Sequence, residues 1–219
     1  GPADRRRWGY TRVMAHGAPV AAVGLCCLLA ACGSPPATGD LPTPIPSPAP
    51  PSGSVAGNGA PLVVFLGDSL TAGLGVAERE AFPARVEARV EEAGLDLEVV
   101  NAGVSGDTSA GGLRRLEWVL GLEPEVVVVG LGANDGLRGQ PLEATEDNLR
   151  RILEGIRAAG ARPILLGMRV PPSLGPAYSE GFAAIYPELA AELEVALVPF
   201  LLEGVAARPE LNQGDGIHP

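Results

Sequence analysis

The stretch "VVFLGDSLTAG", residues 63–73, begins with four apolar residues and continues into a Gly-Asp-Ser sequence and a second glycine. A short apolar run that ends at turn residues is typical of a buried strand. Ser69 would lie in the tight turn after this strand and present its hydroxyl group there. Two interpretations follow: Ser69 is a nucleophile, or it is one of the serines that turns commonly contain.

Similar apolar runs recur along the chain and alternate with helical patterns. The strand-like runs cover residues 62–66, 97–102, 125–131, 162–168 and 195–200. Helical patterns lie near 80–93, 109–121, 142–159 and 178–192, and three of them end at Gly94, Gly121 and Gly160. Uninterrupted apolar strands are typical of a parallel sheet covered on both faces. The sequence therefore predicts a three-layer, doubly wound (flavodoxin-like) α/β domain with a five-stranded parallel sheet.

Composition narrows the classes of function. The chain has 219 residues and a net charge of -10, and it contains no lysine, so nothing favours nucleic-acid binding. Its 3 cysteines all lie within the first 32 residues, and His218 is the only histidine after that segment. We therefore expect no disulfide, no metal site and no organic cofactor in the folded domain.

The N-terminal segment has the features of an export signal. Arginines precede the apolar run "APVAAVGLCCLLAAC", residues 18–32, which is too short to span a bilayer. The final "LAAC" resembles a bacterial lipobox, which predicts a signal peptide over 1–32 and lipidation of Cys32. A plain secretory signal and a short apolar helix are the alternatives. A lipid on Cys32 would make the protein an exported lipoprotein of the cell envelope, anchored in a membrane.

The rest of the chain divides into a linker and a domain. Residues 33–60 are rich in Pro, Gly and Ser and cannot bury a core, so we expect a partly extended, disordered spacer. Residues 61–219 contain all of the predicted strands and helices and form the predicted domain.

Polar residues follow several of the predicted strands and would meet at one edge of the sheet. Ser69 needs a general base, and His218 is the only histidine of the domain. Asp215 lies three residues before His218, close enough to bind its other ring nitrogen. The backbone N–H groups of Ser69 and Gly106 and the side-chain amide of Asn134 are candidate oxyanion donors. Ordinary turn chemistry is the alternative for Gly106 and Asn134, and a plain surface position is the alternative for His218.

Four short motifs carry a resemblance to a known family. They are "GDSL" at 67–70, "GDT" at 106–108, "GAND" at 132–135 and "DGIHP" at 215–219. Together they resemble the blocks of the SGNH (GDSL) hydrolases, and the sequence over 61–219 is similar to their arylesterase, lysophospholipase and acyl-CoA thioesterase branch. The resemblance implies that Ser69 is the nucleophile, His218 the base and Asp215 its orienting acid. It also implies oxyanion donors at Ser69, Gly106 and Asn134.

The resemblance also implies a class of substrate: small acyl esters, thioesters or lysophospholipids. The loop after the fourth predicted strand lies on the active edge, and its side chains Leu174, Tyr178 and Phe182 either line an acyl groove or cover the core. Family members continue into a final helix, so we expect the domain ending at Pro219 to be truncated, with low activity and a mobile His218 loop.

Two other functions fit parts of the pattern. An enzyme of the same fold that removes acetyl groups from carbohydrate would share the four motifs. A non-catalytic module that binds a nucleotide would need a glycine-rich phosphate loop. "GLGAND", residues 130–135, lacks the third glycine of that loop, which disfavours the binding module.

Overall fold

The structure is a computed structural model that describes residues 59–219. The expected signal peptide and the predicted lipidation site at Cys32 lie outside the described residues, as does the expected linker apart from residues 59 and 60.

The described chain forms one five-stranded sheet in which every pair of neighbours is parallel. The strands are β1 (Leu62–Gly67), β2 (Glu98–Gly103), β3 (Val126–Gly130), β4 (Arg162–Leu166) and β5 (Ala196–Val198). Their spatial order is β2-β1-β3-β4-β5, so the chain crosses over β1 once and then winds in the other direction. The predicted doubly wound fold is confirmed.

The register of the sheet aligns the ends of its central strands. Gly67, the last residue of β1, pairs with Gly103 of β2 on one side and with Gly130 of β3 on the other. The loops that leave these three strands therefore begin side by side, at the edge where ligands bind in open α/β sheets.

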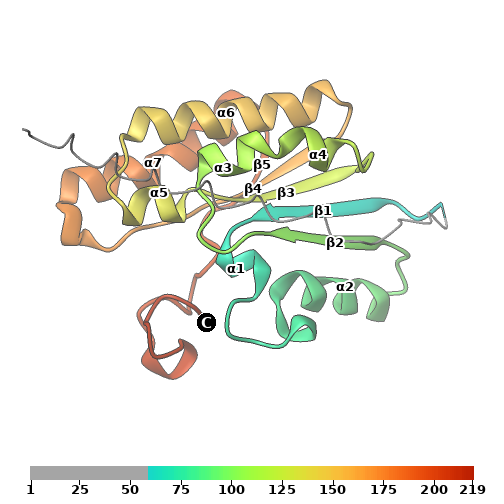
Figure 1. Ribbon diagram of the computed structural model, residues 1–219, viewed down its shortest axis with the longest axis horizontal. Helices are drawn as coiled ribbons and strands as arrows, with labels where there is room; N and C mark the ends of the chain where they lie inside the picture. Colours follow the sequence, from blue (N-terminus) through green and yellow to red (C-terminus); the bar gives the residue numbers. More distant parts are fainter. Residues whose placement is uncertain (1–58) are drawn as a thin grey trace, which may run out of the picture. The chain divides into compact units, whose positions relative to one another are not determined.

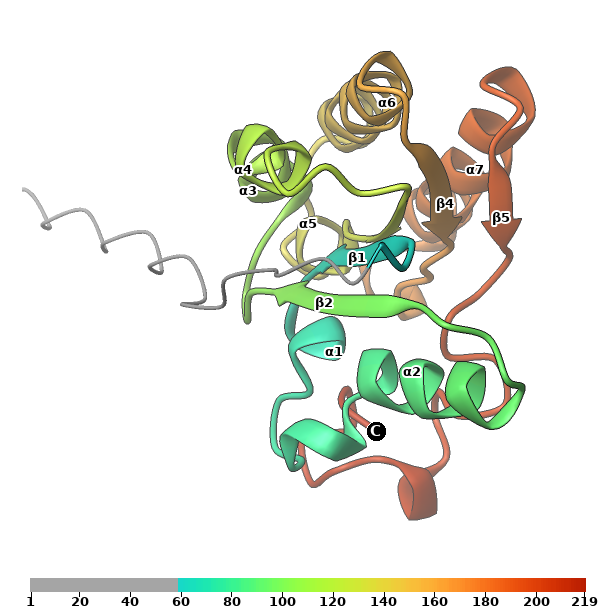
Figure 2. The same ribbon diagram turned by 90° about the vertical axis from the view of Figure 1, so that its right-hand side faces the viewer.

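Helices cover the two faces of the sheet unequally (Figures 1 and 2). One face carries α1 (Ser69–Ala72), α2 (Phe82–Glu92) and the segment that follows β5. The opposite face carries the other helices: α3 (Ser109–Arg114), α4 (Leu116–Leu120), α5 (Ala133–Leu137), α6 (Leu142–Ala158) and α7 (Pro176–Glu192). Single 3-10 turns lie at Glu78–Glu80, Pro172–Leu174 and Pro209–Leu211.

The helix boundaries match the predictions with two differences. Gly94 and Gly160 follow α2 and α6 in the left-handed conformation, with φ of 73° and 85°, as predicted for helix ends. The helix predicted over 109–121 is two helices, because the backbone of Arg115 leaves the helical conformation between α3 and α4. The short helices α1 and α5 were not predicted.

Two clusters of buried side chains form the core, one on each face. The larger cluster contains Val64, Leu66, Val127 and Val129 from β1 and β3 and packs against α3, α4, α6 and α7. The smaller cluster contains Phe65, Val126, Val128 and Leu166 and packs against Phe82 of α2. Within residues 59–219, no helix combines the length and the apolar character that a membrane crossing requires.

Candidate active site

The turn after β1 fixes the position of Ser69. Gly67 has no room for a side chain, because a Cβ atom there would lie 1.9 Å from Thr71 Oγ1. The Asp68 carboxylate caps α1 by accepting a hydrogen bond from the Leu70 N–H at 3.0 Å. Ser69 is therefore the first residue of α1, where no earlier turn of helix supplies an acceptor for its N–H group. The residue is largely buried, with 9% of its surface exposed, but it lines a cavity.

Ser69 begins a chain of hydrogen bonds that passes through His218 to Asp215. Its Oγ lies 2.8 Å from His218 Nε2, and His218 Nδ1 lies 2.6 Å from Asp215 Oδ2. The other oxygen of Asp215 accepts hydrogen bonds from the N–H groups of Ile217 and His218, at 2.9 and 3.0 Å. With the ring proton on Nδ1, His218 donates to Asp215 and presents Nε2 as the acceptor for the Ser69 hydroxyl. The structure thus brings Ser69 to the Asp215–His218 pair, which lies 149 positions further along the chain.

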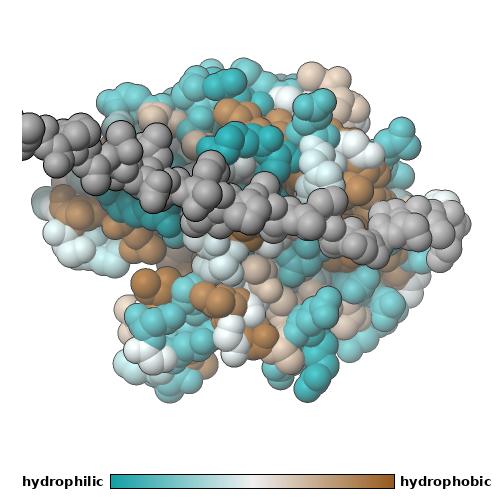
Figure 3. All heavy atoms as spheres, in the orientation of Figure 1, coloured by the Kyte–Doolittle hydropathy of each residue, from teal (hydrophilic) through white to brown (hydrophobic). Residues whose placement is uncertain are grey.

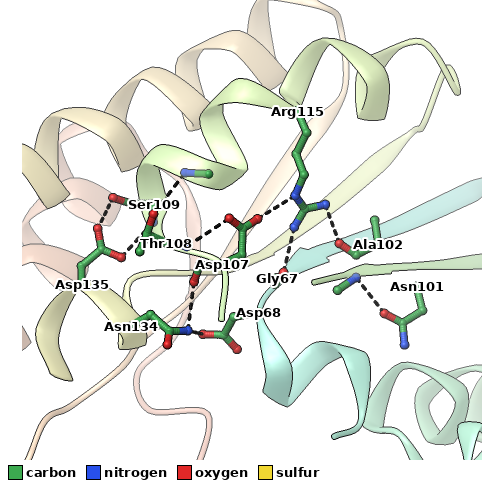
Figure 4. Close-up of polar contacts among 12 residues, drawn as sticks. Gly67, Asp68, Asn101, Ala102, Asp107, Thr108, Ser109, Arg115, Asn134 and Asp135 are labelled. Carbon is green, nitrogen blue, oxygen red and sulfur yellow. Dashed lines mark hydrogen bonds and ion pairs between the residues drawn. The ribbon is translucent and has the colours of Figure 1, made fainter. Parts of the chain in front are cut away.

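The two other candidate oxyanion donors lie in segments that hydrogen bond to each other, the loop before α3 and the first turn of α5. Gly106 has a φ of +80°, which only glycine adopts readily, and it precedes Thr108, the N-cap of α3. Asn134 is in the first turn of α5, and its Nδ2 donates to the Asp107 carbonyl oxygen at 2.9 Å. Nδ2 also lies 3.4 Å from Asp68 Oδ2 (Figure 4). This second contact is long, so one N–H of Asn134 is available to a stronger acceptor.

Two carboxylates beside Ser69 and His218 have opposite pKa shifts. The hydrogen bonds from the backbone N–H groups of Ile217 and His218, followed by the His218 side chain, lower the pKa of Asp215 to about 2. Asp215 is therefore ionised at neutral pH and stabilises a protonated His218. Burial raises the pKa of Asp68 to about 6, despite the hydrogen bond from Leu70.

Two cavities flank Ser69 and His218. The first, of about 320 Å³, is lined by both of these residues together with side chains of α1, α2 and the C-terminal segment. The second, which we call the apolar cavity, has a volume of about 330 Å³. Its lining includes Leu70, Ala133, Val170, Leu202 and Ile217. Leu70, Ala133 and Ile217 directly neighbour Ser69, Asn134 and His218 in the chain, although these three residues themselves do not line the apolar cavity.

Leu174, Tyr178 and Phe182 line neither of these cavities. Phe182 is fully buried and packs edge-on against Tyr186, so it covers the core, as one of the two alternatives expected. Tyr178 donates its hydroxyl hydrogen to the Gln140 carbonyl oxygen, and Leu174 is 45% exposed. Leu174 belongs to the 3-10 turn before α7, and Tyr178 and Phe182 belong to α7, which contributes no residue to the wall of the apolar cavity.

Sequence reasoning missed two charged residues at the site. Asp68 could have been singled out, since it precedes Ser69 directly. Arg115 could not, because two of its three acceptors are backbone carbonyl oxygens, of Gly67 and Ala102, which leave no mark in the sequence. Over residues 59–219, no group of three or more His, Cys, Asp or Glu side chains is arranged to hold a metal ion.

Comparison with known proteins gives one family. The model of the GDSL-like lipase/acylhydrolase family matches residues 65–219. The chain is 45% identical over 161 residues to the esterase TesA of Pseudomonas aeruginosa, covering 73% of this chain and 80% of that protein. It is also 45% identical over 161 residues to the thioesterase 1/protease 1/lysophospholipase L1 of Escherichia coli K12, covering 73% and 76%.

Comparison with solved structures also finds an esterase of the SGNH-hydrolase family. The crystal structure of AlinE4, an SGNH-hydrolase family esterase, superposes with a TM-score of 0.69 at 44% identity. The match covers 73% of this chain and 86% of that one. The similarity therefore extends over the whole sheet and both sides of the site.

Proposed function

Because the chain belongs to the GDSL-like lipase/acylhydrolase family and is a carboxylic ester hydrolase of the SGNH type, we propose that Ser69 is its nucleophile. His218 is the general base, and Asp215 orients it. The observation that carries this assignment is the unbroken chain of hydrogen bonds from Ser69 Oγ through both ring nitrogens of His218 to Asp215.

The reaction proceeds in two halves. Ser69 Oγ attacks the carbonyl carbon of an ester or thioester while His218 Nε2 takes the hydroxyl proton. The protonated His218 then gives that proton to the leaving alcohol or thiol, which leaves an acyl group on Ser69. A water molecule, deprotonated by His218, then attacks this acyl-enzyme, and His218 returns the proton to Ser69 Oγ as the acid is released. The ionised Asp215 carboxylate stabilises the imidazolium ion in both halves.

The negative oxygen that forms in each half needs hydrogen-bond donors. We assign this role to the N–H groups of Ser69 and Gly106 and to the side-chain amide of Asn134, and we call the three groups the oxyanion donors. The N–H of Ser69 at the start of α1 and the weakly engaged second N–H of Asn134 support this assignment.

A fluorophosphonate probe tests the nucleophile. The probe should label the enzyme once, on Ser69, and inactivate it. Ser69→Ala should lose both labelling and esterase activity while its circular dichroism spectrum stays unchanged. Labelling of the Ser69→Ala variant, or full activity in it, would refute the assignment.

The apolar cavity is suited to the acyl chain of the substrate. Three of its lining residues, Leu70, Ala133 and Ile217, directly neighbour Ser69, Asn134 and His218 in the chain. An ester whose carbonyl oxygen contacts the oxyanion donors can therefore extend its chain toward this cavity. Its lining is mostly apolar, and burying methylene groups there stabilises the complex by about 0.8 kcal/mol each. Figure 3 shows apolar residues gathered on this part of the surface, where the C-terminal segment approaches the layer of α5 and α7.

A substitution that fills the cavity tests this role. Ala206 is exposed and lines the apolar cavity, so Ala206→Phe occupies it without crowding the core. The variant should lose kcat/KM for p-nitrophenyl octanoate but not for p-nitrophenyl acetate. Ala158→Phe, at the exposed end of α6, is the matched control. Equal losses for the two esters would exclude the cavity as the acyl site.

The same assays separate the alternative substrates. We propose acyl esters, thioesters and lysophospholipids as the substrate class, because the apolar cavity accepts a chain longer than acetyl. Acetylated xylan should therefore be a poorer substrate than p-nitrophenyl butyrate, lysophosphatidylcholine or an acyl-CoA. A clear preference for acetylated xylan would favour the carbohydrate O-acetylesterase instead.

We also propose that the protein is exported and held in a membrane by a lipid on Cys32. The support is the sequence "LAAC" at the end of an apolar run that follows several arginines. When the full chain is expressed in a bacterium supplied with labelled palmitate, the label should enter the protein. Cys32→Ser should abolish this labelling, whereas Cys26→Ser should retain it.

A further inference from the structure

We infer that the ion pair between Asp107 and Arg115 positions all three oxyanion donors, so that it acts on the transition state rather than on substrate binding. The inference rests on the proposed function of Ser69, Gly106 and Asn134. Neither Asp107 nor Arg115 contacts the reacting atoms in this scheme; both are positioning residues.

Arg115 joins three separate segments at the active edge of the sheet (Figure 4). Its Nη2 donates to the Gly67 carbonyl oxygen at 2.8 Å, at the end of β1, and its Nη1 donates to the Ala102 carbonyl oxygen at 2.6 Å, in β2. Its Nε donates to Asp107 Oδ2 at 2.8 Å. A planar guanidinium group can hold three acceptors in fixed directions, which a single ammonium group cannot do.

Two of these contacts, to Gly67 and to Asp107, lie close in the chain to an oxyanion donor, and Asp107 also connects Arg115 to the third donor. The Gly67 carbonyl is two residues before the Ser69 N–H. Asp107 directly follows Gly106, so fixing the Asp107 side chain fixes the loop that presents the Gly106 N–H. The Asp107 carbonyl oxygen accepts the hydrogen bond from Asn134 Nδ2 at 2.9 Å, so the residue that Arg115 holds is itself the residue that orients Asn134.

Asp107 is held on two sides. While Oδ2 accepts from Arg115, Oδ1 accepts from the Thr108 N–H at 3.1 Å, at the start of α3. The side chains of Arg115 and Asp107 are only 15% and 12% exposed. The free energy lost by removing two charges from water is about as large as the attraction that a buried ion pair gains, so stabilisation of the fold does not by itself explain this pair. The contacts of the pair are better explained by a role in holding the segments that carry Ser69, Gly106 and Asn134 in place.

The expected consequence is a loss of rate at nearly constant substrate affinity. Arg115→Lys keeps the positive charge but cannot hold the three acceptors together. Displacement of catalytic groups by about 1 Å costs about 100-fold in rate, so kcat should fall about 10- to 100-fold. Asp107→Asn keeps an oxygen acceptor and removes the ion pair, and it should lower kcat in the same direction. KM should change less than about threefold for both variants, because the apolar cavity is untouched.

The test compares Arg115→Lys, Asp107→Asn and the double variant with the parent enzyme. Arg150→Lys is the matched control, because Arg150 pairs with Glu146 of α6 and Glu192 of α7, neither of which is an oxyanion donor. The rate is expressed per active site, counted by fluorophosphonate titration, so that unfolded protein does not enter the value. An alkyl boronic acid serves as the probe of the transition state, since Ser69 Oγ adds to boron, His218 takes the proton and the adduct carries the negative charge at the oxyanion donors.

The inference predicts that the inhibition constant of the boronic acid rises in parallel with the loss of kcat, while KM and the control stay near parental values. It also predicts that the double variant loses no more than the worse single variant, because the two residues act as one unit. A rise in KM with unchanged boronic acid affinity would overturn it, as would parental kcat in Arg115→Lys. If Ser69→Ala loses activity but Arg115→Lys keeps the parental kcat, only this inference is refuted. If Ser69→Ala remains active, the proposed function itself is refuted.

Discussion

At the scale of single residues, Asp68 is a buried carboxylic acid next to Ser69, the proposed nucleophile. It is 1% exposed, caps α1 through the Leu70 N–H and lies 3.4 Å from Asn134 Nδ2. Burial raises its pKa from 3.8 to about 6, so the folded protein binds this proton more tightly than the unfolded chain does. Above pH 6, Asp68 is ionised in both states, and burying its charge lowers the free energy of unfolding by the full amount. As the pH falls from about 6 to 3.8, the folded protein takes up the proton first, and this penalty disappears.

Replacing Asp68 with asparagine should remove that cost. Asparagine caps a helix as well as aspartate does, so Asp68→Asn keeps the contact to Leu70. The variant should be more stable than the parent by about 2–3 kcal/mol at pH 8, from 1.36 kcal/mol for each pKa unit, and the difference should shrink toward pH 4. Urea unfolding at a series of pH values measures this. A difference that stays constant with pH would show that Asp68 does not titrate in this range.

Asn134 offers the most direct test of the oxyanion donors. Asn134→Ala should lower kcat by about 10²–10³-fold, the usual cost of removing one such donor, with little change in KM. Steady-state assays on a soluble aryl ester give both constants. A rise in KM with kcat retained would instead assign Asn134 to ground-state binding.

The residues of the proposed site could be singled out in the sequence by their position after a strand or by their residue type. Ser69, Gly106 and Asn134 come just after strand-like runs, and His218 is the only histidine of the domain, so residue type and position sufficed. The contacts that hold them could not be predicted in the same way. Arg115 donates to a carbonyl oxygen 48 positions away, and any residue carries such an acceptor. The wall of the apolar cavity also lacks a sequence signal, since much of it comes from an irregular segment without periodicity.

At the scale of elements, the helix that carries Ser69 rests directly on the end of β2. A Cβ atom on Gly103 would lie 2.2 Å from the backbone nitrogen of Ala72, the last residue of α1. Gly103→Ala should therefore push α1 away from the sheet. The expected cost is about 1–3 kcal/mol of stability, together with a loss of esterase activity, because Ser69 moves with α1.

The matched control for this substitution is Gly214→Ala. A Cβ atom on Gly214 would have no heavy atom within 4 Å, so this variant should unfold at the parental urea concentration. Urea unfolding of the two variants, followed by circular dichroism, compares them. Equal stability of Gly103→Ala and Gly214→Ala would mean that α1 can shift without cost.

All five strands and four of the helical regions were predicted, since each has a long apolar run or an apolar face. The helices α1 and α5 were not, because segments of four and five residues contain too few turns for a periodic pattern. Helices this short are not stable alone and form only in their tertiary setting. For α1 that setting is the Asp68 cap and the contact with Gly103, neither of which periodicity reveals.

At the scale of the molecule, the site depends on the alignment of the strand ends. Gly67, Gly103 and Gly130 pair across the sheet, so the loops that carry Ser69, Gly106 and Asn134 leave the sheet at one place. His218 joins them from 149 positions away. The site thus depends on the whole sheet. Most of the buried apolar side chains, in contrast, lie on the face covered by α3, α4, α6 and α7, so we expect this face to contribute most to the stability of the domain.

This unequal distribution of the core leads to the last prediction. Ile152 of α6 is fully buried in the larger cluster, whereas Val86 of α2 is 40% exposed on the other face. Ile152→Ala should cost about 2–5 kcal/mol through lost burial and the cavity that remains. Val86→Ala should cost less than about 1 kcal/mol. For a domain of this size, the first substitution should lower Tm by about 5–15 °C and the second by only a few degrees. Activity at 25 °C should survive in both variants, because neither side chain touches the site. Similar Tm values for the two variants would show instead that α2 and the C-terminal segment hold the sheet as firmly as the opposite layer does.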